Sequence, residues 1–128
     1  YLRSVTFGVA VELPTGFTVT VYSGEKETTD DQPCVIELKQ VREPLVIRSH
    51  RIGDEIRTGG GNKSVASLLA EQRVARRQRN LVPVVCDRDG IVAVLADRFG
   101  SGCDVVARRP SSGGMKCILM ICGVSRDG

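Results

Sequence analysis

Residues 48–83, RSHRIGDEIRTGGGNKSVASLLAEQRVARRQRNLVP, contain the clearest helical periodicity in the sequence. Val65, Leu68 and Leu69 recur at the i, i+3, i+4 spacing that places apolar side chains on one face of a helix. We therefore predict a helix over residues 63–79, entered from a glycine-rich bend at residues 59–61. This helix interrupts a chain whose other patterns are those of strands.

Outside this stretch the sequence indicates short strands joined by turns. Residues 17–22 alternate apolar and polar side chains behind a Pro-Thr-Gly turn, which predicts a hairpin over residues 9–22. Residues 84–86 and 91–95 flank a turn in which Gly90 can take the left-handed conformation that closes a second hairpin. Further strands are expected at residues 34–38, 45–48, 103–107 and 116–124. The predicted fold class is α+β, mostly β: about eight strands in a small β-barrel or sandwich-like module with one helical insertion.

The length of the chain fits one domain. With 128 residues, of which 41% are hydrophobic, it can bury a modest core. Residues 1–43 form an N-terminal hairpin and strand region, and residues 44–128 the main module, which we expect to be one compact domain together. No apolar run approaches the roughly 18 residues of a membrane span, and no signal-peptide pattern opens the chain. The start at Tyr1 without an initiator Met indicates a domain excised from a longer protein.

Positive charge is concentrated in the middle of the chain. Residues 1–41 hold 3 Lys/Arg against 6 Asp/Glu, residues 42–79 hold 9 against 4, and residues 80–128 hold 6 against 5. The formal net charge of +3 therefore hides a strongly basic middle third. Such a segment is the electrostatic footprint of a nucleic-acid contact surface.

Arginines dominate this basic segment. If the helix persists, Arg73, Arg76 and Arg77 share one stripe at the i, i+3, i+4 spacing, and Glu71 is the nearest acid in sequence. A solvated helix face is the alternative. We favour phosphate contact, because the planar guanidinium fork suits bidentate bonding to phosphate. The predicted RNA-binding residues are Arg48, Arg51, Lys63, Arg73, Arg76, Arg77 and Arg79.

The kind of nucleic acid can be narrowed from the aromatic content. Aromatic residues make up 4% of the chain, and none lies in the basic segment. Recognition of single-stranded RNA depends on aromatic stacking platforms. Their scarcity favours contacts with phosphates and ribose 2′-hydroxyls along a helical stem.

Three other features have plain structural explanations. Gly53 and Asp54 fit a turn in which the Asp side chain accepts a hydrogen bond from nearby backbone. Glu71 should pair with Lys63 or a nearby arginine, since the sequence offers no acid or base partner for a catalytic carboxylate. His50, the only histidine, is expected to be a polar neighbour of phosphate or a surface residue rather than a general base.

The sequence offers no set of residues for catalysis or metal binding. Residues 57–64 compare with a P-loop, but Arg57 and Asn62 stand where that motif has fixed glycines. Residues 111–116 match a nucleotide loop only in their small residues, and a plain turn suffices there. The five cysteines lack Cys-x-x-Cys spacing and lie mostly in apolar runs, as reduced buried thiols do; they are Cys34, Cys86, Cys103, Cys117 and Cys122. We predict no catalytic residue, no metal site and no cofactor in this fragment.

The features of residues 44–98 follow a recognisable order. An extended segment with arginines runs into Gly-Asp, then a glycine-rich bend, a lysine-led helix with a glutamate, an arginine, a proline and a hairpin. These features fall on Leu45-Val46-Ile47-Arg48, Arg51, Gly53-Asp54, Gly59, Lys63, Leu68-Leu69, Glu71, Arg79, Pro83 and Ile91-Val92-Ala93-Val94. The order resembles the C-terminal domain of tRNA(Ile)-lysidine synthetase, although that family usually has a proline near Ala75 and a glycine near Ala96.

The resemblance implies a fold and a function. The fold would be a compact β-rich domain related in shape to one in the β subunit of phenylalanyl-tRNA synthetase. The domain would bind tRNA on its acceptor-stem side. An N-terminal ATP pyrophosphatase domain, whose Ser-Gly-Gly-x-Asp-Ser loop is absent here, would use ATP and lysine to modify the wobble cytidine of isoleucine tRNA.

The implied parent is a cytoplasmic ligase of tRNA modification. The implied partners of this chain are tRNA and the parent's N-terminal catalytic domain, with no membrane contact. The alternative is a structural β module whose basic face docks on another protein domain, such as an acidic surface of its own catalytic half.

Overall fold

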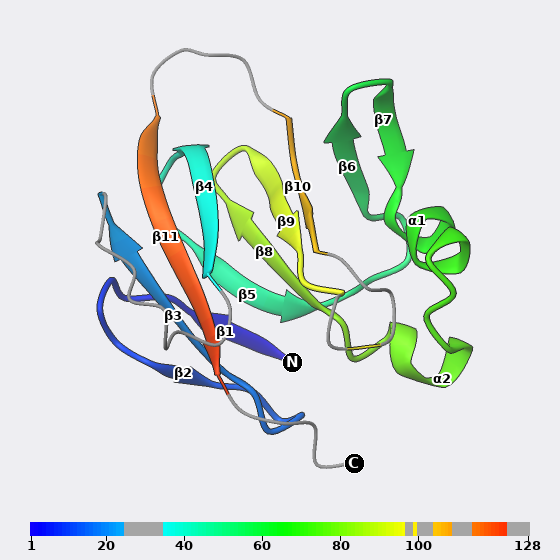
Figure 1. The fold of residues 1–128 in the computed structure, drawn as a ribbon, viewed down its shortest axis with the longest axis horizontal. Helices are drawn as coiled ribbons and strands as arrows, with labels where there is room; N and C mark the ends of the chain where they lie inside the picture. Colours follow the sequence, from blue (N-terminus) through cyan, green and yellow to red (C-terminus); the bar gives the residue numbers. More distant parts are fainter. Residues whose placement is uncertain (25–34, 97–98, 100–103, 109–113, 123–128) are drawn as a thin grey trace.

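The fold of the chain is a pair of antiparallel sheets with a hairpin and two short helices at one end (Figure 1). The computed structural model describes residues 1–24, 35–96, 99, 104–108 and 114–122. The first sheet has the order β1 (Leu2–Ser4), β5 (Val46–Ser49), β8 (Pro83–Asp87), β9 (Gly90–Val94) and β10 (Val105–Val106). The second has the order β2 (Val11–Glu12), β3 (Thr18–Ser23), β11 (Met115–Cys122) and β4 (Val35–Val41).

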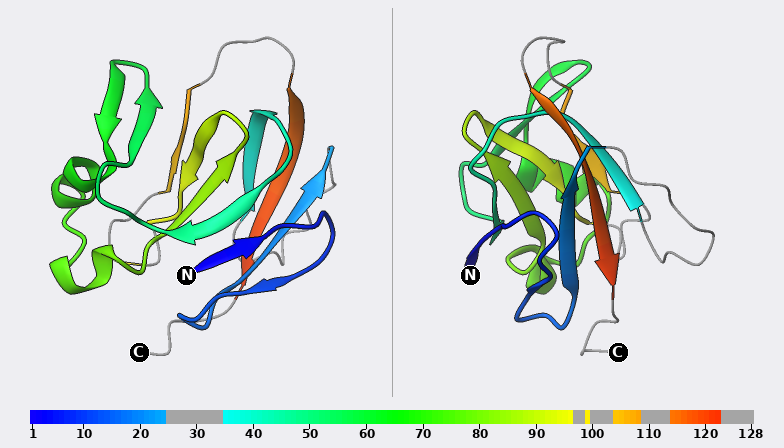
Figure 2. Two further views of the ribbon diagram at one scale, coloured as in Figure 1. Left: turned by 180° about the vertical axis from the view of Figure 1, so that it is seen from behind. Right: turned by 90° about the vertical axis from the view of Figure 1, so that its left-hand side faces the viewer.

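The two sheets stack as separate layers with the core between them (Figure 2, right). On β3 the strand period of two places Val19 and Val21 inward, where both are fully buried. Ile47 and Val85 of the first sheet and Leu119 of the second are also fully buried in the same apolar cluster. The fold is therefore the sandwich-like form of the prediction, with open sheets, and not a closed barrel.

Both predicted hairpins are present. Val11 pairs with Val19 and Glu12 with Thr18 in β2–β3. In β8–β9, Asp87 pairs with Gly90, whose φ of 130° is the left-handed geometry that this tight turn requires.

The first residues of the chain are tied into the larger second part. The Tyr1 amino group donates to Ser49 Oγ at 3.0 Å, and the Tyr1 hydroxyl donates to the Leu81 carbonyl at 2.9 Å. β1 pairs with β5 along its length. Residues from both sides of position 43 thus share the first sheet.

The strand count of the prediction is too low. The described residues hold eleven strands instead of about eight. One strand that the sequence analysis omitted is β1, whose three residues are all exposed. The other two, β6 (Glu55–Thr58) and β7 (Gly61–Ser64), form a separate hairpin. Their apolar content is a single residue, Ile56, so there is almost no alternation to detect.

The single helix predicted over residues 63–79 is also wrong. Two helices occupy this stretch, α1 (Val65–Glu71) and α2 (Arg76–Arg79), separated by four residues. Lys63 lies on β7 and not on a helix. Ser64 caps α1, since its Oγ accepts a hydrogen bond from the Ser67 amide at 3.3 Å. Neither helix is long and apolar enough to cross a membrane, within the residues that the structure describes.

Candidate nucleic-acid interface

The basic segment gathers at one end of the sandwich, where the β6–β7 hairpin, α1 and α2 lie together (Figure 1). The chain enters this end from β5, crosses a turn at residues 50–54 and leaves it into β8. The Asp54 carbonyl accepts a hydrogen bond from the Val65 amide at 2.9 Å, which ties the entry turn to the start of α1. The basic residues between β5 and β8 are therefore brought together in one region of the fold.

Arg48 is held by Asp54 inside this region. Arg48 Nη1 and Nη2 donate to the two carboxylate oxygens of Asp54 at 2.9 and 2.8 Å, a bidentate ion pair. The two side chains are only 13% and 10% exposed. The hydrogen bonds that Arg48 donates to Asp54 raise the pKa of Arg48. The Nη1–Nη2 edge of the guanidinium that the sequence assigned to RNA is thus occupied by a carboxylate.

The same aspartate shapes the turn that follows. Asp54 Oδ2 accepts a hydrogen bond from the Arg51 amide at 2.7 Å, and Gly53 has a φ of 93°. This confirms the predicted turn glycine with a backbone-bonding Asp. The turn carries Arg51 and Ile52 outward, and Ile52 is fully exposed. Arg51 is exposed as well, and its side chain forms no hydrogen bond or ion pair among the described residues.

Lys63 is paired, as the sequence predicts for Glu71. Lys63 Nζ donates to the Glu71 carboxylate, across from β7 to the end of α1. Lys63 is half-buried and Glu71 exposed. Glu71 is the acid nearest in sequence to Arg73, Arg76 and Arg77, and its carboxylate is paired with Lys63 instead of with them.

The end of α1 explains the position of Arg73. The Arg73 amide donates to the Ala70 carbonyl at 3.1 Å and the Val74 amide to the Leu69 carbonyl at 3.0 Å, the two hydrogen bonds of a Schellman motif. Arg73 occupies the left-handed position of this motif with a φ of 60°, where glycine is usual. An arginine at this position carries a steric cost, and its side chain is exposed.

α2 presents two of the predicted contact residues and anchors a third. Arg76 and Arg77 are exposed and make no side-chain hydrogen bond or ion pair with any residue that the structure describes. Arg79 is half-buried, and its Nε donates to the carbonyl of the buried Val74 at 3.0 Å. The continuous stripe expected from one helix is absent, because Arg73 lies between the helices and not on α2.

Two arginines of this region were missed by sequence reasoning. Arg57 is an exposed residue of β6, and the Arg108 amide donates to its carbonyl at 2.8 Å. Arg108 follows β10, about fifty residues further along the chain, so only the fold brings the two together. Arg57 lies within the basic segment but outside the predicted helix, and Arg108 lies outside the basic segment. No local pattern in the sequence indicates that either one is part of the site.

His50 does not reach the surface with its ring nitrogens. Nδ1 and Nε2 are both buried and make no hydrogen bond to a described residue. Burial lowers the pKa of His50, and Arg48 acts in the same direction against the opposing effect of Asp54. The imidazole is therefore neutral near pH 7, and its buried nitrogens do not suit phosphate contact.

Two of the five cysteines are described with their side chains, and neither is exposed. Cys86 and Cys117 are buried free thiols, whose pKa values are raised by burial. Cys34 and Cys103 lie outside the described residues, as does the side chain of Cys122. Within the described ranges, no group of three or more His, Cys, Asp or Glu side chains could hold a metal ion.

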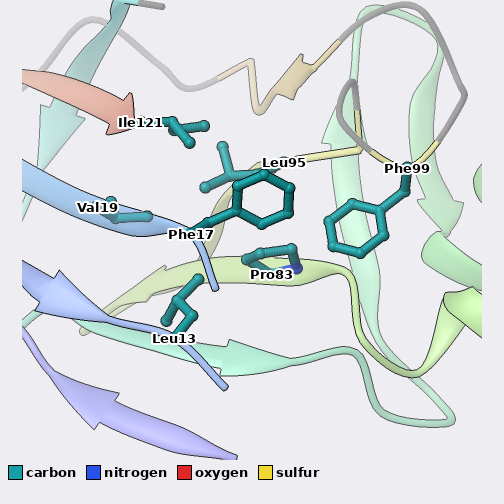
Figure 3. A pocket seen from close by; sticks show the side chains of 7 residues that line it. All are labelled: Leu13, Phe17, Val19, Pro83, Leu95, Phe99 and Ile121. Carbon is teal, nitrogen blue, oxygen red and sulfur yellow. The ribbon is translucent and has the colours of Figure 1, made fainter. Parts of the chain in front are cut away.

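A small pocket opens between the two sheets and is apolar (Figure 3). Phe17 and Phe99 meet edge to face across it, with ring centroids 5.7 Å apart. No titratable side chain is among its lining residues, which are Leu13, Phe17, Val19, Pro83, Leu95, Phe99 and Ile121. The pocket is thus a gap at the rim of the core.

The chain is similar in sequence to several bacterial tRNA(Ile)-lysidine synthases. The chain is 38% identical over 87 residues to a tRNA(Ile)-lysidine synthase of Exiguobacterium sibiricum, covering 64% of the chain and 21% of that protein. It is 34% identical over 65 residues to the tRNA(Ile)-lysidine synthase of Clostridioides difficile, covering 51% of the chain and 14% of that protein. The matched parts lie at the C-terminal ends of these enzymes. No family profile matches the chain.

The fold is also similar to that of a solved structure, the C-terminal domain of tRNA(Ile)-lysidine synthase, abbreviated TilS. The crystal structure of the TilS C-terminal domain superposes with a TM-score of 0.69 and 19% identity, over 100% of this chain and 98% of that one. The resemblance to the C-terminal domain of tRNA(Ile)-lysidine synthase is confirmed. The chain spans only about a fifth or less of the length of the curated relatives it matches. The enzymatic activity in the names of these relatives therefore belongs to proteins much longer than this chain.

Proposed function

We propose that this chain is a tRNA-binding domain of a tRNA(Ile)-lysidine synthetase. The observation that carries the proposal is the group of exposed arginines Arg73, Arg76 and Arg77, which have no acidic partner among the described residues. Glu71 is engaged by Lys63, so it does not neutralise them. Guanidinium groups left free in this way suit the phosphates of a polyanion.

The placement of these arginines supports a contact with a helical stem. Arg76 and Arg77 lie on α2 and Arg73 lies in the segment between α1 and α2, and both helices are at one end of the sandwich (Figure 1). Aromatic side chains, which would stack on unpaired bases, are absent from residues 48–83. A positively charged surface of matching shape can bind the phosphates and 2′-hydroxyls on one side of an acceptor stem without base stacking.

Within the proposal the three groups of predicted residues have different roles. Arg73, Arg76 and Arg77, together with Arg51, are the direct phosphate contacts. Lys63 keeps a partly exposed ammonium beside Glu71 and is a secondary contact. Arg48 and Arg79 position the others, because the first fixes the 51–54 turn through Asp54 and the second joins α2 to the Val74 carbonyl.

The chemistry of the modification belongs to another part of the parent enzyme in this proposal. That part would use ATP and lysine on the wobble cytidine of isoleucine tRNA, in the cytoplasm. The present chain would contribute no catalytic residue. Incubated alone with ATP, lysine and an isoleucine tRNA transcript, it is expected to release no AMP or pyrophosphate above a no-protein control.

A binding experiment tests the proposal against docking of the basic face on another protein domain. The chain is titrated with an isoleucine tRNA transcript in a gel-shift assay, and separately with the catalytic half of a homologous synthetase in a pull-down. Salt-sensitive tRNA binding supports the proposal. Retention of the catalytic half without tRNA binding contradicts it and favours the docking module.

A further inference from the structure

The turn of the β6–β7 hairpin lies under the guanidinium of Arg108. Arg108 Nη1 is 3.0 Å from the position that a Cβ atom on Gly59 would occupy. The backbone hydrogen bond from Arg108 to the Arg57 carbonyl holds the segment after β10 against β6. The hairpin and the end of β10 therefore form one local surface, beyond the residues assigned to α1 and α2.

This surface carries two arginines, Arg57 and Arg108, whose backbones are joined by a hydrogen bond. Arg57 and Arg108 are exposed, and neither forms a side-chain hydrogen bond or ion pair with a described residue. Glu55 shares the outer face of β6 with Arg57 at the two-residue spacing of a strand, but it forms no ion pair with it. An anion that contacted both guanidinium groups would compensate two charges that lack an acidic partner among the described residues.

The glycines of the turn are not all required by the backbone. Gly61 has a φ of 110°, which only glycine adopts readily. Gly60 lacks such a φ, and a Cβ atom on it would meet nothing within 4 Å. A side chain at position 60 would thus fit the fold and would project from the hairpin tip, one residue beyond the glycine that faces Arg108. Its absence leaves room for a bulky ligand to approach the tip.

We propose that Arg57 and Arg108, over the bare tip of the β6–β7 hairpin, form a second phosphate-binding contact for the RNA backbone. It rests on the proposed function and extends it, because these residues lie on different elements from Arg73, Arg76 and Arg77. A stem bound at α2 would be gripped at two separated points, which fixes its direction across the end of the sandwich.

The test compares double variants of the full 128-residue chain in tRNA binding at several salt concentrations. Each lost phosphate contact flattens the slope of log affinity against log salt by about 0.9 for a duplex, so R57A/R108A should flatten it by about 2. R57K/R108K keeps both charges and should retain most of the slope. R3A/R88A removes the same charge from β1 and the β8–β9 turn and is the matched control.

A single substitution tests the hairpin tip. Gly60→Leu should weaken tRNA binding several-fold with an unchanged Tm, since the added side chain meets open space in the free protein. Equal slopes for R57A/R108A and R3A/R88A would overturn the second contact. If R76A/R77A weakens binding while R57A/R108A does not, the second contact fails and the proposed function stands. If neither variant weakens binding, both fail.

Discussion

The guanidinium of Arg48 and the carboxylate of Asp54 meet through two hydrogen bonds of 2.9 and 2.8 Å, six residues apart in the chain. Asp54 also holds the Arg51 amide at 2.7 Å. One carboxylate therefore fixes both the end of β5 and the turn from which Arg51 projects. Asp54 thus links β5 to the turn at the basic end of the sandwich.

Replacement of Asp54 by Ala should destabilise the fold by about 2 to 3 kcal/mol. The substitution leaves the mostly buried Arg48 charge unpaired, which costs far more than loss of an exposed pair. Urea denaturation measures the free energy of unfolding. The control is Asp89→Ala, because the Arg42–Asp89 pair is 45% and 47% exposed and should contribute less than about 1 kcal/mol. Equal losses in the two variants would show that the buried pair has no special role.

The stability of the domain should fall as the pH drops below about 6.5, and His50 is the cause. Burial lowers the pKa of His50 below its ordinary value of 6.5. The unfolded chain therefore binds the His50 proton more tightly than the folded chain does. The free energy of unfolding has its full value above pH 6.5 and decreases as the pH falls towards the pKa of His50 in the folded state. Since His50 is the only histidine, His50→Gln should remove the loss of stability that begins as the pH falls below 6.5. An unchanged slope in thermal melts of that variant would refute this explanation.

Arg73→Gly should stabilise the domain and weaken tRNA binding at the same time. Arg73 holds the left-handed position at the end of α1, where glycine avoids a steric cost of about 1 kcal/mol. We expect Tm to rise by a few degrees. Arg76→Gly is the matched control, since in α2 the same change should lower stability by about 1 kcal/mol. A fall in Tm for Arg73→Gly would show that the arginine is retained for stability.

Arg79→Ala should cost about 1 kcal/mol of stability, because it removes the hydrogen bond from Nε to the buried Val74 carbonyl. R76A/R77A should change stability by less than about 0.5 kcal/mol per residue. Chemical denaturation of the three proteins separates the two roles. If Arg79→Ala is as neutral as the double variant, its hydrogen bond does not anchor α2.

The sequence predicts the parts of this fold that local patterns control. The β8–β9 hairpin follows from the apolar runs on either side of Gly90, and the turn before β6 follows from Gly53 and Asp54. The helix break was missed because Arg73 occupies a position where glycine would have signalled the end of α1. Local patterns also carry no record of contacts between distant segments, such as that of Arg108 with β6.

The candidate site is predictable in composition but not in geometry. The basic segment predicts where charge gathers, and the pair between Lys63 and Glu71 is confirmed. The occupation of Arg48 by Asp54 depends on how the 51–54 turn folds back on β5. The spacing of arginines along one assumed helix could not show that Arg79 is bonded to the Val74 carbonyl while Arg73, Arg76 and Arg77 have no partner among the described residues.

The measurement that tests the central claim most directly is the salt dependence of tRNA affinity for the chain and for R73A/R76A/R77A. Each arginine that contacts a phosphate contributes about 0.7 to 1 to the slope of log affinity against log salt. The triple variant should therefore show a slope flattened by roughly 2 to 3, with the greatest loss of affinity at low salt and a nearly unchanged Tm. A triple variant that keeps both its Tm and its full salt-dependent affinity would show that these arginines are a solvated surface and that tRNA does not bind at α2 and the segment before it.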